Sequence, residues 1–153
     1  MRDVRIIEFF VPGEPVGKGR PRIGRVGQHA RLFTPEKTAS YEGLIAHAGC
    51  QAMAGDTPIP GPVLVELHMG LSIPQSMSKK RKAQALAGLV FPTKKPDMDN
   101  VIKAIFDGLN GVVWVDDVQV VDSVVRKRYA ETPGVRVRVV PLYTTDHMEA
   151  KAV

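Results

Sequence analysis

Lys94-Lys95-Pro96-Asp97-Met98-Asp99-Asn100 is the stretch on which the fold and the chemistry of this chain depend. A residue that precedes proline disfavours helix, so a helix is expected to begin just after Pro96, with Asp97 or Asp99 as its cap. Apolar residues then recur at helical spacing, and Asn110-Gly111 is a typical helix stop. The expected core stripe of this helix consists of Ile102, Ile105, Phe106 and Leu109.

The polar side of the same predicted helix carries Asp99, Lys103, Asp107 and Asn110. Lys103 can pair with Asp99 one turn away, or it can orient a phosphate and stabilise its charge in the transition state. The Asp-X-Asp-Asn sequence by itself is more typical of a turn or helix cap than of a metal site, and only its neighbours favour a metal.

A second acidic pair, Asp116-Asp117, follows the apolar residues 112–115. Carboxylates about 4 Å apart repel by roughly 4 kcal/mol at an effective dielectric constant of about 20. Three gathered acids therefore require a compensating cation or proton, and a divalent cation bound by oxygen ligands meets this need. A metal site is expected if the strand predicted after Trp114 returns Asp117 to the start of the helix.

The composition indicates one globular domain with an acidic partner. The 153 residues are 44% hydrophobic and carry a formal net charge of +5, which favours but does not require binding to nucleic acid. The single Cys50, expected in a helix core, excludes a disulfide framework within the chain. The sequence contains neither a membrane-spanning apolar stretch nor a signal peptide, so a soluble, cytoplasmic protein with no membrane partner is expected.

The N-terminal part is predicted to contain a strand at residues 4–11, buried on much of both faces, and a helix from residues 34–35 to Gly55. Tyr41, Leu44, Ile45, Ala48 and Ala52 form its expected apolar stripe. Between them, residues 15–35 are rich in glycine and contain no acid. This segment either contacts phosphates or is a solvated surface loop. Its cations are Lys18, Arg20, Arg22, Arg25 and Arg31.

The middle and the end of the chain predict further strands. Residues 63–71 alternate as a strand whose polar face, with Glu66 and His68, is expected to meet water. Residues 76–88 predict a short helix with a basic first turn, which either binds an anion or is solvated. Strands at 118–129 and 135–142 are expected to form a hairpin through the turn 131–134. A loose tail is expected at residues 144–153.

Three motifs together resemble the RusA family of Holliday junction resolvases. They are Lys-Pro-Asp-Met-Asp-Asn-X-X-Lys, Phe-Asp-Gly-Leu-Asn-Gly and Trp-X-Asp-Asp-X-Gln-Val-Val, and the similarity is strongest between Lys94 and Lys127. The Gly-Lys-Gly-Arg-Pro-Arg segment at residues 17–22 is similar more loosely. A compact member of the family passes almost directly from strand to acids, whereas this chain inserts residues 70–93.

The resemblance implies a Mg²⁺-dependent endodeoxyribonuclease, with Mn²⁺ as a possible substitute, that nicks four-way DNA junctions in pairs during recombination and repair. Its catalytic and metal-binding acids fall on Asp97, Asp99 and Asp117, and its functional lysine falls on Lys103. Nucleic-acid contacts are expected at Lys18, Arg20, Arg22, Lys94, Lys95 and Asn100. A bacterial or prophage origin is also implied.

The sequence therefore predicts one α+β domain over residues 1–143, with a small mixed sheet of about four strands and helices packed against it. A homodimer is expected, because a four-way junction has approximate two-fold symmetry. Two alternatives remain: a junction-binding protein without catalysis, and a less selective nuclease that acts on flaps or branched DNA.

Overall fold

The computed structural model describes residues 5–19, 22–26, 29–33 and 36–142, so the tail predicted at residues 144–153 lies outside it. The fold is α+β, with a mixed four-stranded sheet in the order β1-β6-β4-β5. Its strands are β1 (Ile7–Pro12), β4 (Val63–Leu71), β5 (Val120–Tyr129) and β6 (Gly134–Pro141). Strand β6 runs antiparallel to β1 and β4, and β5 runs parallel to β4. The fold class predicted from the sequence is confirmed.

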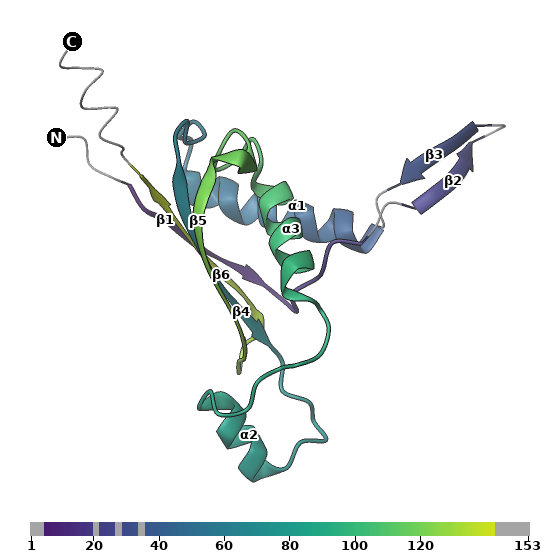
Figure 1. Cartoon of the computed structure of the whole chain (residues 1–153), viewed down its shortest axis with the longest axis vertical. Coiled ribbons are helices and arrows are strands. Elements are labelled where there is room, and N and C mark those ends of the chain that lie inside the picture. Colours follow the sequence, from purple (N-terminus) through teal and green to yellow (C-terminus); the bar gives the residue numbers. More distant parts are fainter. Residues whose placement is uncertain (1–4, 20–21, 27–28, 34–35, 143–153) are drawn as a thin grey trace.

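Two helices, α1 (Glu36–Met53) and α3 (Met98–Leu109), cover one face of this sheet (Figure 1). The strand alternation supplies the core, because every second residue of β4 from Val63 to Leu71 is buried, as are Val135, Val137 and Val139 of β6. In the described part of the chain no helix lies on the opposite face of the sheet, where the polar alternate residues of β4 and β6 are found.

Helices α1 and α3 approach each other closely at glycines. A Cβ on Gly108 would lie 2.9 Å from Cγ2 of Ile45, and one on Gly49 would lie 2.7 Å from Cδ2 of Leu109. The α1 stripe consequently differs from the prediction: Tyr41 and Ile45 are buried as expected, whereas Leu44 is 37% exposed. The contact surface is centred on small residues, a feature that apolar periodicity does not reveal.

The predicted hairpin between the last two strands is wrong. Strands β5 and β6 are not neighbours, because β4 lies between them. The connection crosses the end of β4, where the Ala130 amide donates to the Leu71 carbonyl at 2.9 Å. Gly70 makes the crossing possible, since a Cβ there would lie only 2.7 Å from that of Ala130. The apolar β4 gains more by occupying the sheet centre than the edge.

Two N-terminal predictions also need correction. Strand β1 is buried on one face only, at Ile7 and Val11, while Glu8 and Phe10 are exposed. The basic glycine-rich segment contains a two-stranded antiparallel hairpin, β2 (Arg22–Val26) and β3 (His29–Phe33). Local alternation in this segment was too weak for a strand prediction. The β2–β3 hairpin projects from the body of the molecule (Figure 1).

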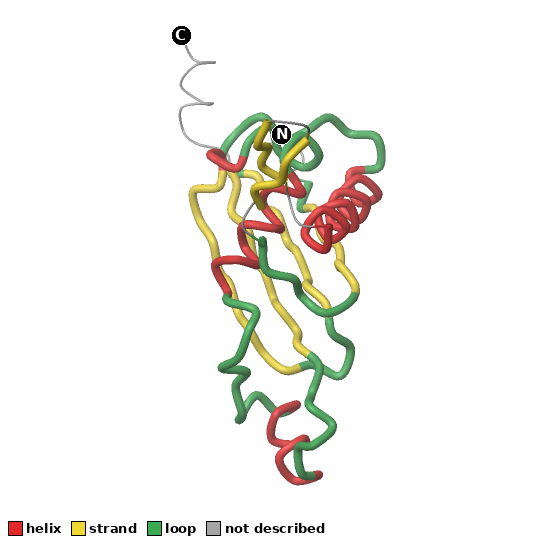
Figure 2. Tube along the Cα trace, turned by 90° about the vertical axis from the view of Figure 1, so that its right-hand side faces the viewer, coloured by secondary structure: helices red, strands yellow, loops and turns green. Residues whose placement is uncertain are grey.

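The inserted residues 70–93 form a second projection. The short helix predicted within residues 76–88 is present as α2 (Lys79–Leu86), and its cap is Ser78, whose hydroxyl accepts from the Arg81 amide at 3.2 Å. It lies beyond one end of the sheet (Figure 2). Cys50 is exposed, contrary to the prediction of a core position. Within the described residues, no helix has the length and apolar character needed to cross a membrane.

Candidate active site

Helix α3 begins at the acidic motif. Asp97 is its N-cap residue, but the Asp97 side chain makes no capping hydrogen bond. Asp99 lies in the first turn, and both residues are exposed. Lys94 and Lys95, also exposed, precede them on the connection from α2. The two carboxylates therefore stand free at the helix start, next to two cations.

The Gly17–Gly19 loop packs directly on this helix start. The Lys18 amide donates to the Asn100 carbonyl at 2.9 Å, and the Gly19 amide donates to Oγ1 of Thr38 on α1 at the same distance. A Cβ on Gly17 would lie 3.0 Å from that of Asn100. Glycine thus permits a close backbone approach. An open pocket of about 590 Å³ results, with Lys95, Asp97 and Asn100 in its lining.

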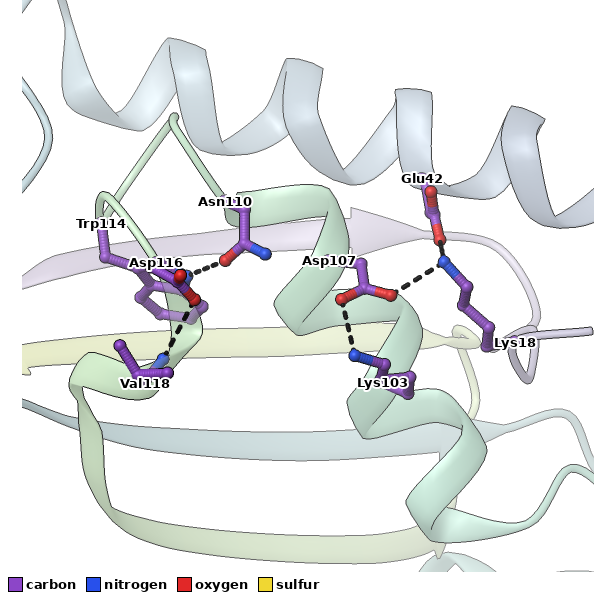
Figure 3. A network of polar contacts seen from close by, with 8 residues as sticks. All are labelled: Lys18, Glu42, Lys103, Asp107, Asn110, Trp114, Asp116 and Val118. Carbon is purple, nitrogen blue, oxygen red and sulfur yellow. Dashed lines mark hydrogen bonds and ion pairs between the residues drawn. The ribbon is translucent and has the colours of Figure 1, made fainter. Parts of the chain in front are cut away.

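The Lys18 ammonium joins three elements. Its Nζ lies 2.6 Å from Glu42 on α1 and 2.8 Å from Asp107 on α3, and the Lys18 side chain is 23% exposed. Asp107 also accepts from Lys103 at 3.0 Å, so two lysines share one carboxylate (Figure 3). Lys18 was predicted to contact nucleic acid; the structure gives its ammonium two internal partners. Lys103 pairs with Asp107 instead of Asp99.

The charge network shifts the pKa of its members. Burial alone would lower the pKa of Lys18, but hydrogen bonds and charge from Asp107 and Glu42 outweigh burial, so this pKa is raised. Burial would likewise raise the pKa of Asp107, but Lys18 and Lys103 lower it overall. Both groups are therefore held in their charged forms.

The chain after α3 returns to the helix through a turn and a short helix instead of the predicted strand. Trp114 is fully buried, its indole Nε1 donates to Oδ1 of Asn110 at 2.8 Å, and its ring meets Phe106 edge-on with centroids 5.5 Å apart. The 3₁₀ helix η1 (Asp117–Gln119) then contacts α3. Asp116 caps η1 by accepting from the Val118 amide at 3.3 Å (Figure 3).

Gln119 holds this returning segment in place. Its Oε1 accepts from the amides of Val115 and Asp116 at 2.9 and 3.0 Å, and its Nε2 donates to the carbonyls of Ile59 and Gly61 at 2.7 and 2.8 Å. Sequence reasoning assigned Gln119 no role. The available signal was its place in the Trp-X-Asp-Asp-X-Gln motif, two residues after Asp117.

Asp117 comes back to the side of α3, within reach of the charges of Lys103 and Asp107. Burial raises the pKa of the Asp117 carboxyl, the neighbouring Asp116 carboxyl adds to the rise, and the Lys103 charge offsets part of it. Among the described residues, no three acidic, histidine or cysteine side chains converge closely enough to hold a metal ion. The fold thus brings the acids to one helix without closing them into a cluster.

The remaining predicted residues lie at different places. Lys94 anchors the connection to the sheet, since its carbonyl accepts from the Lys127 ammonium and its own Nζ lies 5.8 Å from the Tyr129 ring centroid. Arg20 and the side chain of Arg22 lie outside the described part of the chain. Glu66 and His68 lie on the uncovered face of the sheet, away from α3, because the alternate residues of β4 pack beneath the helices.

Comparison with known proteins places this geometry in a family. The profile described as "Endodeoxyribonuclease RusA" matches residues 12–140. The chain is also 39% identical over 135 residues to "Uncharacterized protein YqaN" of Bacillus subtilis (strain 168), an alignment that covers 87% of this chain and 94% of that protein. Both matches include α3, its acidic start and the returning segment with Asp117.

Proposed function

The chain belongs to the RusA endodeoxyribonuclease family, and from this premise we propose that it is a structure-specific nuclease that resolves Holliday junctions by paired, Mg²⁺-dependent nicking. The observation that carries the proposal is the family match across residues 12–140, which includes Asp97, Asp99, Lys103 and Asp117. DNA recombination and repair are the processes that such an activity serves.

Asp97, Asp99 and Asp117 are the proposed metal ligands. Carboxylate oxygens are the donors that Mg²⁺ and Mn²⁺ prefer, so the donor set suits either ion. Asp97 and Asp99 are exposed and make no side-chain hydrogen bond among the described residues, which leaves both carboxylates free to turn toward a cation. A bound divalent cation supplies an activated water as nucleophile and a Lewis acid for the phosphate.

Lys103 is the proposed phosphate-stabilising residue. Its side chain is 60% exposed on the helix face that lies between the acidic start of α3 and the returning η1. The Asp107 carboxylate, 3.0 Å from its Nζ, limits the positions of the ammonium. A preplaced cation of this kind stabilises charge that develops on a phosphate in the transition state.

The proposed DNA surface surrounds the acids. Lys95 and Asn100 line the pocket at the start of α3, and Lys94 precedes them. Arg20 and Arg22, at the start of the segment that forms the β2–β3 hairpin, are proposed to extend this surface. Lys18 contributes by fixing the glycine loop against α1 and α3. Lys94 and Lys95 form no ion pair among the described residues, so their charges are available to a phosphate backbone.

A nicking assay on a synthetic four-way junction tests the proposal. With Mg²⁺ we expect two symmetric nicks that yield linear duplexes, and we expect Asp99→Asn to reduce the rate by at least about 100-fold, since it removes a charged ligand. Asp122→Asn is the matched control, because Asp122 is an exposed acid on β5 outside the proposed site. This variant should cleave the junction at the wild-type rate.

Three outcomes would contradict the proposal. The first is junction binding with no metal-dependent cleavage by the wild type, which would indicate a binding protein without catalysis. The second is equal cleavage of junctions, flaps and linear duplex at one salt concentration, which would indicate a less selective nuclease. The third is undiminished cleavage by Asp99→Asn, which would place the chemistry elsewhere.

A further inference from the structure

The uncovered face of the sheet contains two neighbouring cross-strand rows of opposite electrostatic character. In the first row, Arg138 on β6 stands between Glu8 on β1 and Glu66 on β4, which are its partners in the strand register. Its Nε lies 3.0 Å from Glu8 and one of its terminal nitrogens lies 3.3 Å from Glu66. The charge in this row is compensated within the protein.

The next row, two residues along each strand, has no such compensation. Arg136 on β6 is the register partner of His68 on β4, and His68 in turn is the partner of Arg126 on β5. All three are exposed. Within residues 5–19 and 36–142, whose side chains the structure describes, none of them forms an ion pair. The register partners of the two arginines are His68 and Phe10, so no acidic side chain lies opposite either arginine in the described sheet.

An aromatic ring lies at the end of the uncompensated row. Phe10 on β1 is the register partner of Arg136, and its side chain is close to the backbone of Gly134, where an added Cβ would lie 2.1 Å from the ring. Phe10 is nevertheless 42% exposed. A shallow pocket of about 200 Å³ joins this ring to the cations of the row and to Arg128. The ring is therefore held in place with part of its surface open.

We propose that this row is a binding site for single-stranded DNA on the sheet face opposite the candidate active site. Arg126 and Arg136 are separated by two strand spacings, roughly 10 Å at the backbone, and contact phosphates of one strand. Phe10 provides a stacking surface for a base. A cationic groove combined with an exposed aromatic ring is the usual arrangement of sequence-tolerant single-strand sites.

The aromatic ring is what favours a single strand over duplex DNA or an acidic protein. In duplex DNA the base faces are stacked and unavailable to Phe10, and only the phosphates would contact the row. An acidic protein would satisfy the arginines but would not require an open ring. Because the row faces away from α3, this inference does not depend on the proposed nuclease activity.

Fluorescence anisotropy with a labelled 20-nucleotide single strand tests the proposal. Titrations of the full chain in EDTA at several salt concentrations give the affinity and the slope of log K against log salt without any contribution from cleavage. Arg126→Gln and Arg136→Gln should each reduce the magnitude of that slope by about 0.7, the value for one phosphate contact on a single strand. Phe10→Leu should weaken binding about fivefold or more without changing the slope.

Arg138→Gln is the matched control, since it removes the same charge from the same strand and face but from the compensated row. It should leave the slope unchanged. An equal change in Arg138→Gln would show that only net charge matters, and unchanged slopes in both test variants would overturn the site. Phe10-independent binding that is stronger for duplex of the same sequence would overturn the single-strand assignment. Circular dichroism melting establishes that each variant is folded.

Discussion

At the scale of single residues, one carboxylate organises the charged face of α3. Asp107 accepts from Lys18 at 2.8 Å and from Lys103 at 3.0 Å, and its side chain is only 19% exposed. Removing one partner of a mostly buried ion pair leaves the other charge poorly solvated, which costs more than the pair itself contributes. The network therefore connects the stability of the fold to the position of the proposed phosphate-binding lysine.

We predict that Asp107→Asn lowers the free energy of unfolding by about 2 kcal/mol near pH 7. The folded-state pKa of Asp107 is below its ordinary value of 3.8, so its stabilising contribution is present above that value. This contribution is lost as the pH falls through the lower folded pKa. Urea unfolding of both proteins from pH 7 to pH 3 should therefore show a difference that shrinks below about pH 4.

Lys18→Met tests the other side of the pair. The pKa of Lys18 in the folded protein is above 10.5, so the contribution of Lys18 to stability is present below that value. It is lost only as the pH rises through the folded pKa. Lys80→Met is a suitable control, because Lys80 is exposed on α2 and forms no ion pair in the described part of the chain. An equal loss of stability in the control, or an Asp107→Asn difference independent of pH, would contradict this account.

At the scale of elements, the returning segment between α3 and β5 depends on one side chain. Gln119 uses its oxygen and both of its amide hydrogens to connect Val115 and Asp116 with the loop before β4, through the Ile59 and Gly61 carbonyls. Asp117 has no comparable anchor of its own among the described residues. The position of this proposed metal ligand is therefore set by a residue outside the proposed ligand set.

We predict that Gln119→Ala reduces the nicking rate about 10- to 100-fold, because a displacement of about 1 Å in a positioned group can have this effect. Junction binding measured without divalent cation should change less than twofold, so the loss should appear in kcat and not in KM. Gln119→Glu keeps one oxygen as an acceptor, but its second oxygen replaces the amide nitrogen that donates to the two carbonyls. The nicking rate of this variant should lie between those of the wild type and Gln119→Ala.

Gln75→Ala, in the exposed loop before α2, is the control for loss of a glutamine side chain. A folded Gln119→Ala protein whose kcat equals that of the wild type would refute the positioning role of Gln119. A parallel fall in binding and rate, with a lowered melting temperature, would instead indicate a general loss of structure.

At the scale of the whole molecule, one domain presents two faces and two projections. The helical face carries the proposed acids, and the uncovered sheet face carries the cationic row. The β2–β3 hairpin projects to the side beyond α1, and α2 projects below the sheet (Figure 1). A single chain provides one set of the proposed acids. Paired nicks on a two-fold symmetric junction therefore favour two chains.

We predict that the chain sediments with twice its 16.7 kDa mass at micromolar concentration. Dimers that contain one Asp99→Asn subunit, purified with two different tags, should nick one strand and leave the junction unresolved. Resolution into linear duplexes by such mixed dimers, or a monomeric mass together with paired nicking, would contradict the two-site arrangement.

Local sequence determined most of the individual elements. The alternation at residues 63–71, the short helix within residues 76–88, the start of α3 after Pro96 and its end at Asn110-Gly111 all follow from interactions within a few residues, and the structure confirms them. The motifs were also sufficient to identify the family, since order and spacing of acids, lysine and tryptophan are properties of the chain itself.

Only the tertiary structure decided how these elements meet. The insertion of β4 between β5 and β6, the use of Gly108 and Gly49 at the helix contact, and the internal partners of Lys18 each depend on residues that are distant in the sequence. Periodicity reports which face of an element is apolar but not which element covers it. The return of Asp117 to α3 is the clearest case, because it depends on Gln119 reaching the carbonyls of Ile59 and Gly61.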